Sequence, residues 1–125
     1  VLVDGDHNYY TVLNELKLIQ NLIKPTTLIV CDDYIGRYSE KDMFYSEREA
    51  YKGNSKASPR KTCEKEGVRN AVVDFIKSQS NINWTIDGFN QGPCFLYNED
   101  FLKIEYNIDY FPGQLARDAK MIFNF

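Results

Sequence analysis

The sequence lacks several features that would place it in a specialised class of protein. Its 125 residues contain no apolar run close to the roughly 20 residues that a membrane-spanning helix needs. Its three cysteines include no Cys-x-x-Cys pair, so neither a disulfide framework nor a zinc site is indicated. The formal net charge of −3, with both signs mixed, offers no basic surface for nucleic acid or an anionic membrane. We therefore expect one reduced, cytoplasmic globular domain.

What the sequence does contain begins with a strand–helix–strand pattern. Residues 1–3 are apolar and have the character of the end of a buried strand. Residues 11–24 carry apolar side chains at helical spacing, and Pro25 ends that helix. Residues 26–31 are apolar and β-branched, which is typical of a strand covered on both faces. A helical connection of this length favours a parallel pair of strands.

The remainder predicts a long loop, a second helix and a hairpin. Residues 35–66 are polar and charged but include several tyrosines, and a loop of this length in a small domain is often functional. Helical periodicity returns over residues 68–76. Residues 82–89 and 93–99 are separated by a short turn, which indicates an antiparallel hairpin. The predicted fold class is α/β, with a parallel strand–helix–strand unit, a helix and a C-terminal antiparallel hairpin.

Acidic residues follow both strands of the predicted parallel pair. Asp4 and Asp6 follow the first strand, with the chain's single histidine, His7, beside them. Asp32 and Asp33 follow the second strand. The carboxyl ends of parallel strands lie at one edge of a sheet, where ligands bind. Turn formation and helix capping are the simpler explanation, but two clusters at one edge favour a site for Mg²⁺ or Ca²⁺.

The motifs at this edge resemble a known family. Asp-Gly-x-His at residues 4–7, Ile-Lys-Pro at 23–25, Asp-Asp-Tyr at 32–34 and the helix at 67–76 are similar to the second half of class I S-adenosylmethionine-dependent methyltransferases. The metal-dependent sugar and macrolide O-methyltransferases, such as the macrocin O-methyltransferase group, are the nearest match. The similarity covers residues 1–99.

The resemblance implies a function for each residue at the edge. Asp4, Asp32 and Asp33 match the positions that hold a divalent cation, Mg²⁺ or another. Asp6 or His7 matches the general base that takes the proton of the acceptor hydroxyl group. The methyl group would then pass from S-adenosylmethionine to an oxygen of a small molecule or sugar.

The same resemblance implies a domain organisation. Residues 1–99 match strands four to seven of a seven-stranded Rossmann-like sheet, with a substrate loop at 35–66, and residues 100–125 form an extension with a short helix predicted at 114–123. Thr26 and Thr27 replace two glycines that are usual in the family. No Gly-x-Gly turn occurs, so we expect the main cofactor site outside this chain and little activity from the chain alone.

Two other functions are compatible with the sequence. The stretches ending in Asp-x-Asp and Asp-Asp also resemble the haloacid dehalogenase phosphohydrolases, although the spacing between the two motifs is too short for that group. A non-catalytic assembly module is the third hypothesis. If the chain is the second half of a methyltransferase sheet, its first strand would be an unpaired edge, which we expect to be covered by the missing half or by another copy in a homo-oligomer.

Overall fold

The structure is a computed structural model that describes four stretches of the chain: residues 1–57, 60, 63–88 and 92–98. The C-terminal extension and its predicted helix at 114–123 lie outside the described residues. Within these four stretches, no helix has the length and apolar character needed to cross a membrane.

The described strands form one mixed sheet: β1 (Leu2–Val3), β2 (Ile29–Ile35), β3 (Trp84–Gly88) and β4 (Gly92–Asn98). Their spatial order is β1-β2-β4-β3. β1 is parallel to β2, whereas β4 is antiparallel to both of its neighbours. Hence β1, β2 and β3 run in one direction and β4 runs in the other. The predicted parallel pair and the predicted hairpin are both confirmed.

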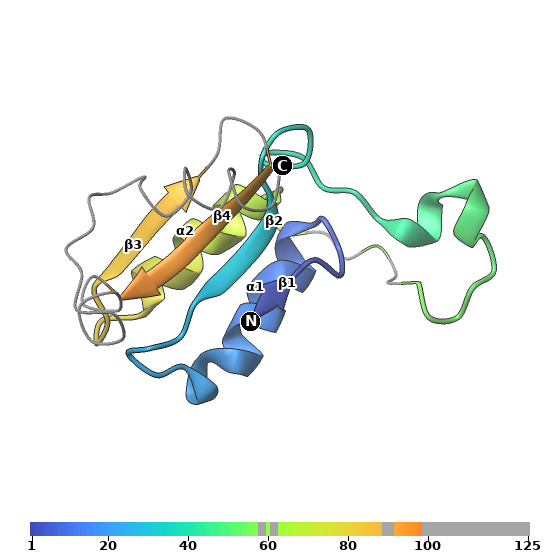
Figure 1. Ribbon diagram of the computed structural model, residues 1–125. Coiled ribbons are helices and arrows are strands. Elements are labelled where there is room, and N and C mark those ends of the chain that lie inside the picture. The colour runs from blue at the N-terminus through green and yellow to red at the C-terminus, as the bar shows by residue number, and fades with distance from the viewer. Residues whose placement is uncertain (58–59, 61–62, 89–91, 99–125) are drawn as a thin grey trace, which may run out of the picture.

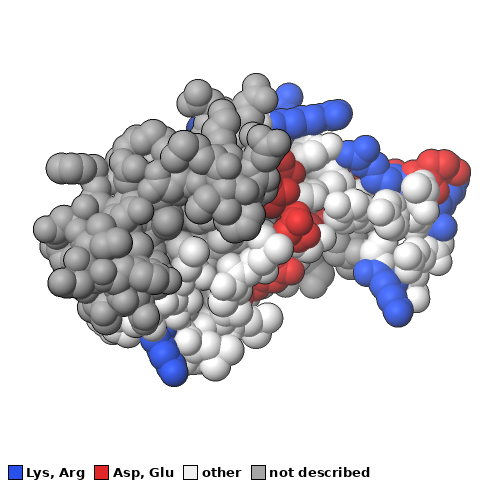
Figure 2. Space-filling view, viewed as in Figure 1, with Lys and Arg blue, Asp and Glu red and all other residues white. Residues whose placement is uncertain are grey.

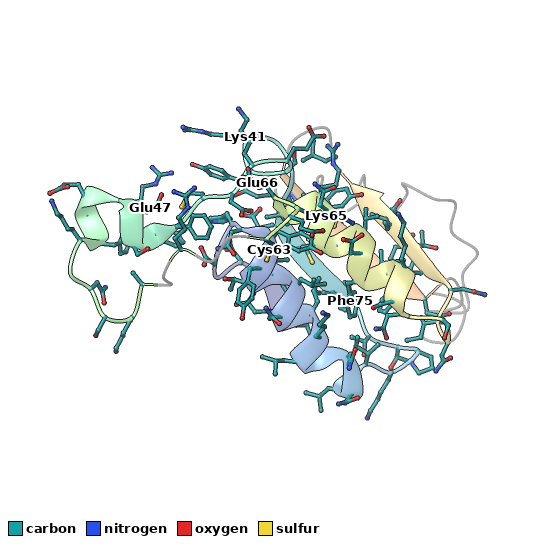
Figure 3. All side chains as sticks on the ribbon, turned by 180° about the vertical axis from the view of Figure 1, so that it is seen from behind. Lys41, Glu47, Cys63, Lys65, Glu66 and Phe75 are labelled. Carbon is teal, nitrogen blue, oxygen red and sulfur yellow. The ribbon has the colours of Figure 1, made fainter. Side chains whose placement is uncertain are left out.

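Two helices cover one face of this sheet: α1 (Tyr9–Ile19), which continues as the 3₁₀ turn η1 (Gln20–Leu22), and α2 (Val68–Ser78). They lie side by side behind the strands in Figure 1 and in front of them in Figure 3, so the described fold has two layers. α1 begins at Tyr9 and not at the predicted Thr11, because the Asn8 side chain accepts a hydrogen bond from Thr11 N at 2.8 Å and caps the helix.

The core lies between the two layers. Leu16 of α1 and Phe75 of α2 are fully buried against Ile29 and Leu96 of the sheet. The Phe75 ring, labelled in Figure 3, lies 6.1 Å from the ring of Trp84. This packing fixes both helices against the strands and so fixes where the loops at the sheet edge begin.

β2 differs from its prediction at both ends. It begins at Ile29 and continues through the acidic pair, which was predicted to follow the strand. Its pairing with β4 is irregular between Cys31 and Ile35, and Asp33 has a φ of 53°. This left-handed residue interrupts the alternation of side chains along β2, so Asp32 and Asp33 do not point simply to opposite faces.

The segment between β2 and α2 is held at its two ends and projects beyond the sheet. It contains two 3₁₀ helices, η2 (Tyr45–Glu47) and η3 (Glu49–Tyr51), which are the green elements at the right of Figure 1. Asp42 Oδ1 accepts hydrogen bonds from Tyr9 N at 2.7 Å and from Gly67 N at 2.8 Å. One carboxylate therefore ties the segment to the starts of both helices.

Gly67 is the position in this segment that tolerates a side chain least. Its φ of 84° and ψ of 153° lie in a region that is essentially restricted to glycine, and a Cβ would lie 2.3 Å from the Ser39 carbonyl oxygen. We expect Gly67→Ala to lower the free energy of unfolding by about 3 kcal/mol or more, since strain of this kind alone costs about 1–3 kcal/mol.

Gly53→Ala is the matched control for this prediction. Gly53 also has a positive φ, 77°, but a Cβ there meets no atom within 4 Å. Its substitution should cost only about 1–2 kcal/mol. Urea denaturation of both variants measures the difference, and equal losses would contradict the proposed clash with Ser39.

Candidate active site

Three of the predicted residues converge where β1 and the paired part of β2 end. Each of Asp4, His7 and Asp32 offers one ligand atom, and these atoms all lie within 4.8 Å of one another. Figure 2 shows acidic side chains gathered in a band near the middle of the face that Figure 1 also shows. The parallel pairing of β1 with β2 explains the convergence, because Val3 lies opposite Cys31 and each strand leads into its acidic residues from there.

The carboxylates at this edge destabilise one another's charge. Partial desolvation of the carboxyl group, followed by repulsion from Asp32, raises the pKa of Asp4. Desolvation also raises the pKa of Asp33, and the neighbouring His7 opposes that rise. A bound cation would remove this repulsion, because it would interact favourably with both carboxylates at once.

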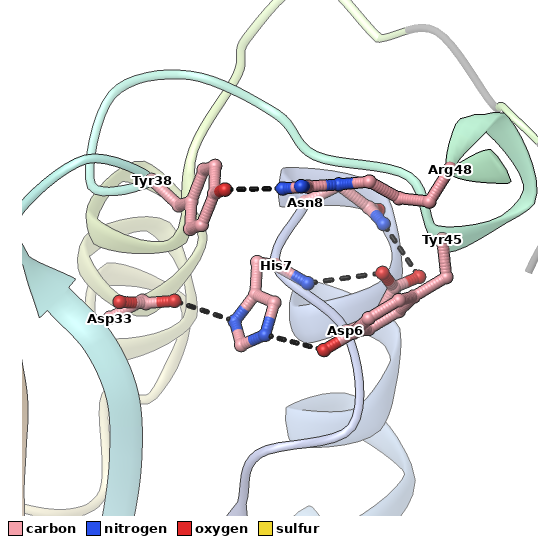
Figure 4. Close-up of polar contacts among 7 residues, drawn as sticks. All are labelled: Asp6, His7, Asn8, Asp33, Tyr38, Tyr45 and Arg48. Carbon is pink, nitrogen blue, oxygen red and sulfur yellow. Dashed lines mark hydrogen bonds and ion pairs between the residues drawn. The ribbon is translucent and has the colours of Figure 1, made fainter. Parts of the chain in front are cut away.

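The fourth acidic residue, Asp33, contacts His7 instead of joining the group of three. Its Oδ2 lies 2.8 Å from His7 Nδ1, and His7 Nε2 lies 3.1 Å from the hydroxyl group of Tyr45 (Figure 4). A carboxylate can only accept, so it selects the tautomer with the proton on Nδ1. In that tautomer Nε2 carries the lone pair and accepts from Tyr45. Asp33 thus orients a buried imidazole whose Nε2 has a lone pair that can accept a proton.

Aromatic residues of the long segment complete the surroundings of His7. The Tyr38 ring stacks on the imidazole with centroids 5.5 Å apart, and the Tyr38 hydroxyl group accepts a hydrogen bond from Arg48 Nη2 at 2.5 Å. Met43 N donates to His7 O at 2.9 Å. The sequence indicated that the segment carries tyrosines, but no local pattern assigned Tyr38 or Tyr45 to the histidine.

Asp6, the other predicted base, is buried in the turn before α1. Its Oδ1 accepts from His7 N at 3.1 Å, and its Oδ2 accepts from Asn8 Nδ2 at 2.7 Å (Figure 4). These bonds hold Asn8 in position to cap α1. Asp6 therefore contributes to the geometry of the turn that presents His7, and its use as a base stays a prediction.

The opposite pKa shifts of Asp4 and Asp74 give a pair of variants with opposite expected effects. The folded state raises the pKa of Asp4, so ionisation of Asp4 reduces stability as the pH rises above about 4. Asp4→Asn should therefore unfold at a higher urea concentration than wild type at neutral pH, with chelator present and by less than about 1 kcal/mol because Asp4 is exposed. Below about pH 4 the two proteins should coincide.

Asp74→Asn is the control of opposite sign. The hydrogen bond from Lys65 lowers the pKa of Asp74, which also accepts from the Tyr9 hydroxyl group. Ionised Asp74 therefore stabilises the fold above its unfolded pKa, and that contribution is lost as the pH falls. Urea midpoints between acid and neutral pH should show Asp74→Asn losing stability where Asp4→Asn gains it. A loss in both variants would contradict repulsion at the sheet edge.

Comparisons of the chain with protein-family models, with curated proteins and with solved structures found no match. The arrangement at the sheet edge comprises two carboxylates close enough together to share one cation and a buried histidine oriented by a third carboxylate.

Proposed function

We propose that the chain belongs to an S-adenosylmethionine-dependent O-methyltransferase that uses a divalent cation. The observation that carries the proposal is the Asp33–His7 pair beside Asp4 and Asp32, at the edge of a sheet where parallel strands end. It supplies a general base and cation ligands at one place, which is the combination that deprotonation of a hydroxyl group requires.

Asp4 and Asp32 fit the cation better than the set of Asp4, Asp32 and Asp33 that the resemblance implies. Their oxygens are hard ligands of the kind that Mg²⁺ prefers. The Asp33 carboxylate is instead engaged by His7 Nδ1. We therefore assign Asp4 and Asp32 to the cation, Asp33 to orientation of the imidazole, and His7 to the proton. A cation held there would lower the pKa of an acceptor hydroxyl group.

The proton transfer follows from the contacts of His7. An acceptor hydroxyl group that replaces the Tyr45 hydroxyl at Nε2 donates its proton to that nitrogen. The Asp33 carboxylate stabilises the imidazolium that forms, through its contact with Nδ1. S-adenosylmethionine, when bound, would supply the methyl group: the acceptor oxygen would bond to the methyl carbon as the bond from sulfur to that carbon breaks. The products would be a methyl ether, S-adenosylhomocysteine and a proton on His7.

The strand order also supports the proposal. Three strands share one direction and the reversed β4 lies between two of them. A parallel strand–helix–strand unit followed by an antiparallel hairpin is what the resemblance to the second half of a class I methyltransferase sheet implies. In that case residues outside this chain would supply the main cofactor site. The activity test therefore uses the natural polypeptide in which this chain occurs.

The test is transfer of a labelled methyl group from S-adenosylmethionine to a panel of alcohols, sugars and phenols in the presence of Mg²⁺. We expect transfer by the natural polypeptide, and a loss of about 10²–10⁴-fold in kcat for His7→Gln, since positioned acid–base groups contribute this much. Glu64→Gln, an exposed carboxyl group remote in sequence from the site residues, should leave kcat unchanged.

Two results would overturn the methyltransferase proposal. No transfer to any acceptor, with phosphate release from phosphomonoesters, would favour the phosphohydrolase hypothesis. Neither activity, together with a stable homodimer in sedimentation analysis, would favour the assembly module. Undiminished transfer by a folded His7→Gln variant would remove His7 from the base role but keep the function.

Cation binding is tested separately on this chain. A cation that binds the folded state alone adds about 2.7 kcal/mol to the free energy of unfolding when it is present at a hundredfold excess over its Kd. We expect Mg²⁺ to raise the Tm in this way, and Asp32→Asn to increase the required Mg²⁺ concentration about tenfold or more, by analogy with losses at metal sites. Glu64→Gln should respond like wild type, and an unchanged response of Asp32→Asn would contradict the assigned ligand.

A further inference from the structure

Two buried cysteines face each other in the middle of the sheet. Cys31 of β2 and Cys94 of β4 are directly opposite in the antiparallel pairing of these strands. Residues opposite each other in a ladder point to the same face, and both thiols belong to the core between the sheet and the helices. Each cysteine is free and fully buried. The two are far apart in the sequence, so no spacing motif identified the pair.

The two thiol groups interact with each other. Burial, and then the neighbouring Cys31 thiol, raise the pKa of Cys94, so this side chain stays protonated at neutral pH. A protonated and fully buried thiol is a poor nucleophile. The folded state therefore protects the pair from reagents in the solvent and at the same time holds the two sulfur atoms next to each other.

The facing position suits a disulfide bond. Val30 N donates to Val1 O, so the backbone groups of Val30 face β1 and those of Cys31 face β4. Cys31 and Cys94 are then a hydrogen-bonded pair of the ladder, in which Cα atoms lie about 5.5 Å apart, and disulfides most often have this separation. The Cβ atoms would need to approach by about 1 Å. The irregular pairing of β2 directly after Cys31 eases that adjustment, because fewer ladder bonds hold the strand there.

We propose that Cys31 and Cys94 are a redox pair that forms an intramolecular disulfide when the chain meets an oxidising small-molecule disulfide. The bond would join β4 covalently to the strand that carries Asp32 and Asp33, immediately before these two residues. A cross-link between residues this far apart restricts the unfolded chain, and the stabilisation increases with the length of the closed loop. The oxidised fold is therefore more stable than the reduced fold, with β2 fixed to β4 beside the candidate active site.

The oxidation is a thiol–disulfide exchange. Because both thiols are buried, the first step needs a transient separation of β4 from β2 or an unfolded chain. One cysteine loses its proton and attacks a sulfur of the small disulfide, which releases one small thiolate and leaves a mixed disulfide. The second cysteine, also as a thiolate, attacks the protein sulfur of the mixed disulfide and releases the other small thiolate. Two protein thiols are oxidised, one small disulfide is reduced, and the two protons pass to the released thiolates.

The experiment measures disulfide formation in mixtures of reduced and oxidised glutathione, once after refolding in native buffer and once in concentrated urea. Cys63→Ser removes the exposed thiol, so that only the proposed pair remains in the chain. Mass spectrometry after alkylation of the unreacted thiols gives the oxidised fraction. We expect the ratio [GSH]²/[GSSG] at half-oxidation to be at least about tenfold higher in native buffer than in urea, because the fold holds the two sulfur atoms together.

Cys94→Ser, which keeps Cys31 and Cys63, is the matched control. It combines a buried cysteine with an exposed one, so its folded form should show no such gain over urea. A ratio for Cys63→Ser that is equal or lower in native buffer would overturn the proposal, since the fold would then not favour the bond. A comparable gain in folded Cys94→Ser would also overturn it, because the gain would not depend on the facing pair. Neither S-adenosylmethionine nor an acceptor is present, so the outcome is independent of the proposed function.

Discussion

The parallel pairing of β1 with β2 is the interaction on which the rest of the site depends. β1 is short, and its register is set by Leu2 opposite Val30 and Val3 opposite Cys31, with Val30 N donating to Val1 O at 2.8 Å. A shift of one residue would turn Val3 out of the core and move the residues that follow it to the other face. The buried face of α1 holds this short strand in register, so helix packing indirectly determines where the carboxylates meet.

The residues at the sheet edge are individually unfavourable for folding. Asp4 and Asp33 both carry charge that their surroundings disfavour, and His7 is a buried imidazole. Contacts with neighbouring side chains hold these residues in place, such as the Tyr38 ring stacked on His7. Binding sites commonly combine unfavourable charge with a rigid surrounding structure in this way, because a ligand supplies the missing stabilisation.

The sequence predicted the parts of the structure that depend on local patterns. The helix before Pro25, the helix over residues 68–76 and the hairpin all follow from hydrophobic periodicity and turn residues, and they are confirmed. The same reasoning identified Asp4 and Asp32 correctly as neighbours, because two strands joined by a helix end at one edge. Helix boundaries were less accurate, since capping by Asn8 outweighed the apolar pattern.

The missed features depend on contacts between distant residues. The left-handed backbone of Asp33, which directs its carboxylate to His7, follows from irregular pairing with β4 and leaves no trace in the local sequence. Tyr45 reaches His7 across 38 positions of the chain. The insertion of β4 beside β2 is likewise decided by the whole sheet. Each of these needs the assembled tertiary structure before it has a physical cause.

Asp42 has a consequence for the motions of the protein. One oxygen of this carboxylate accepts from the amide at the start of α1 and from the amide that precedes α2. The long segment therefore cannot leave the body of the protein without releasing both amides together. In native-state hydrogen exchange, the amides of Tyr9 and Gly67 should belong to one cooperative opening unit, although they are far apart in the sequence. The segment that carries Tyr38 and Tyr45 would then open as a whole, and access to the imidazole would follow that single event.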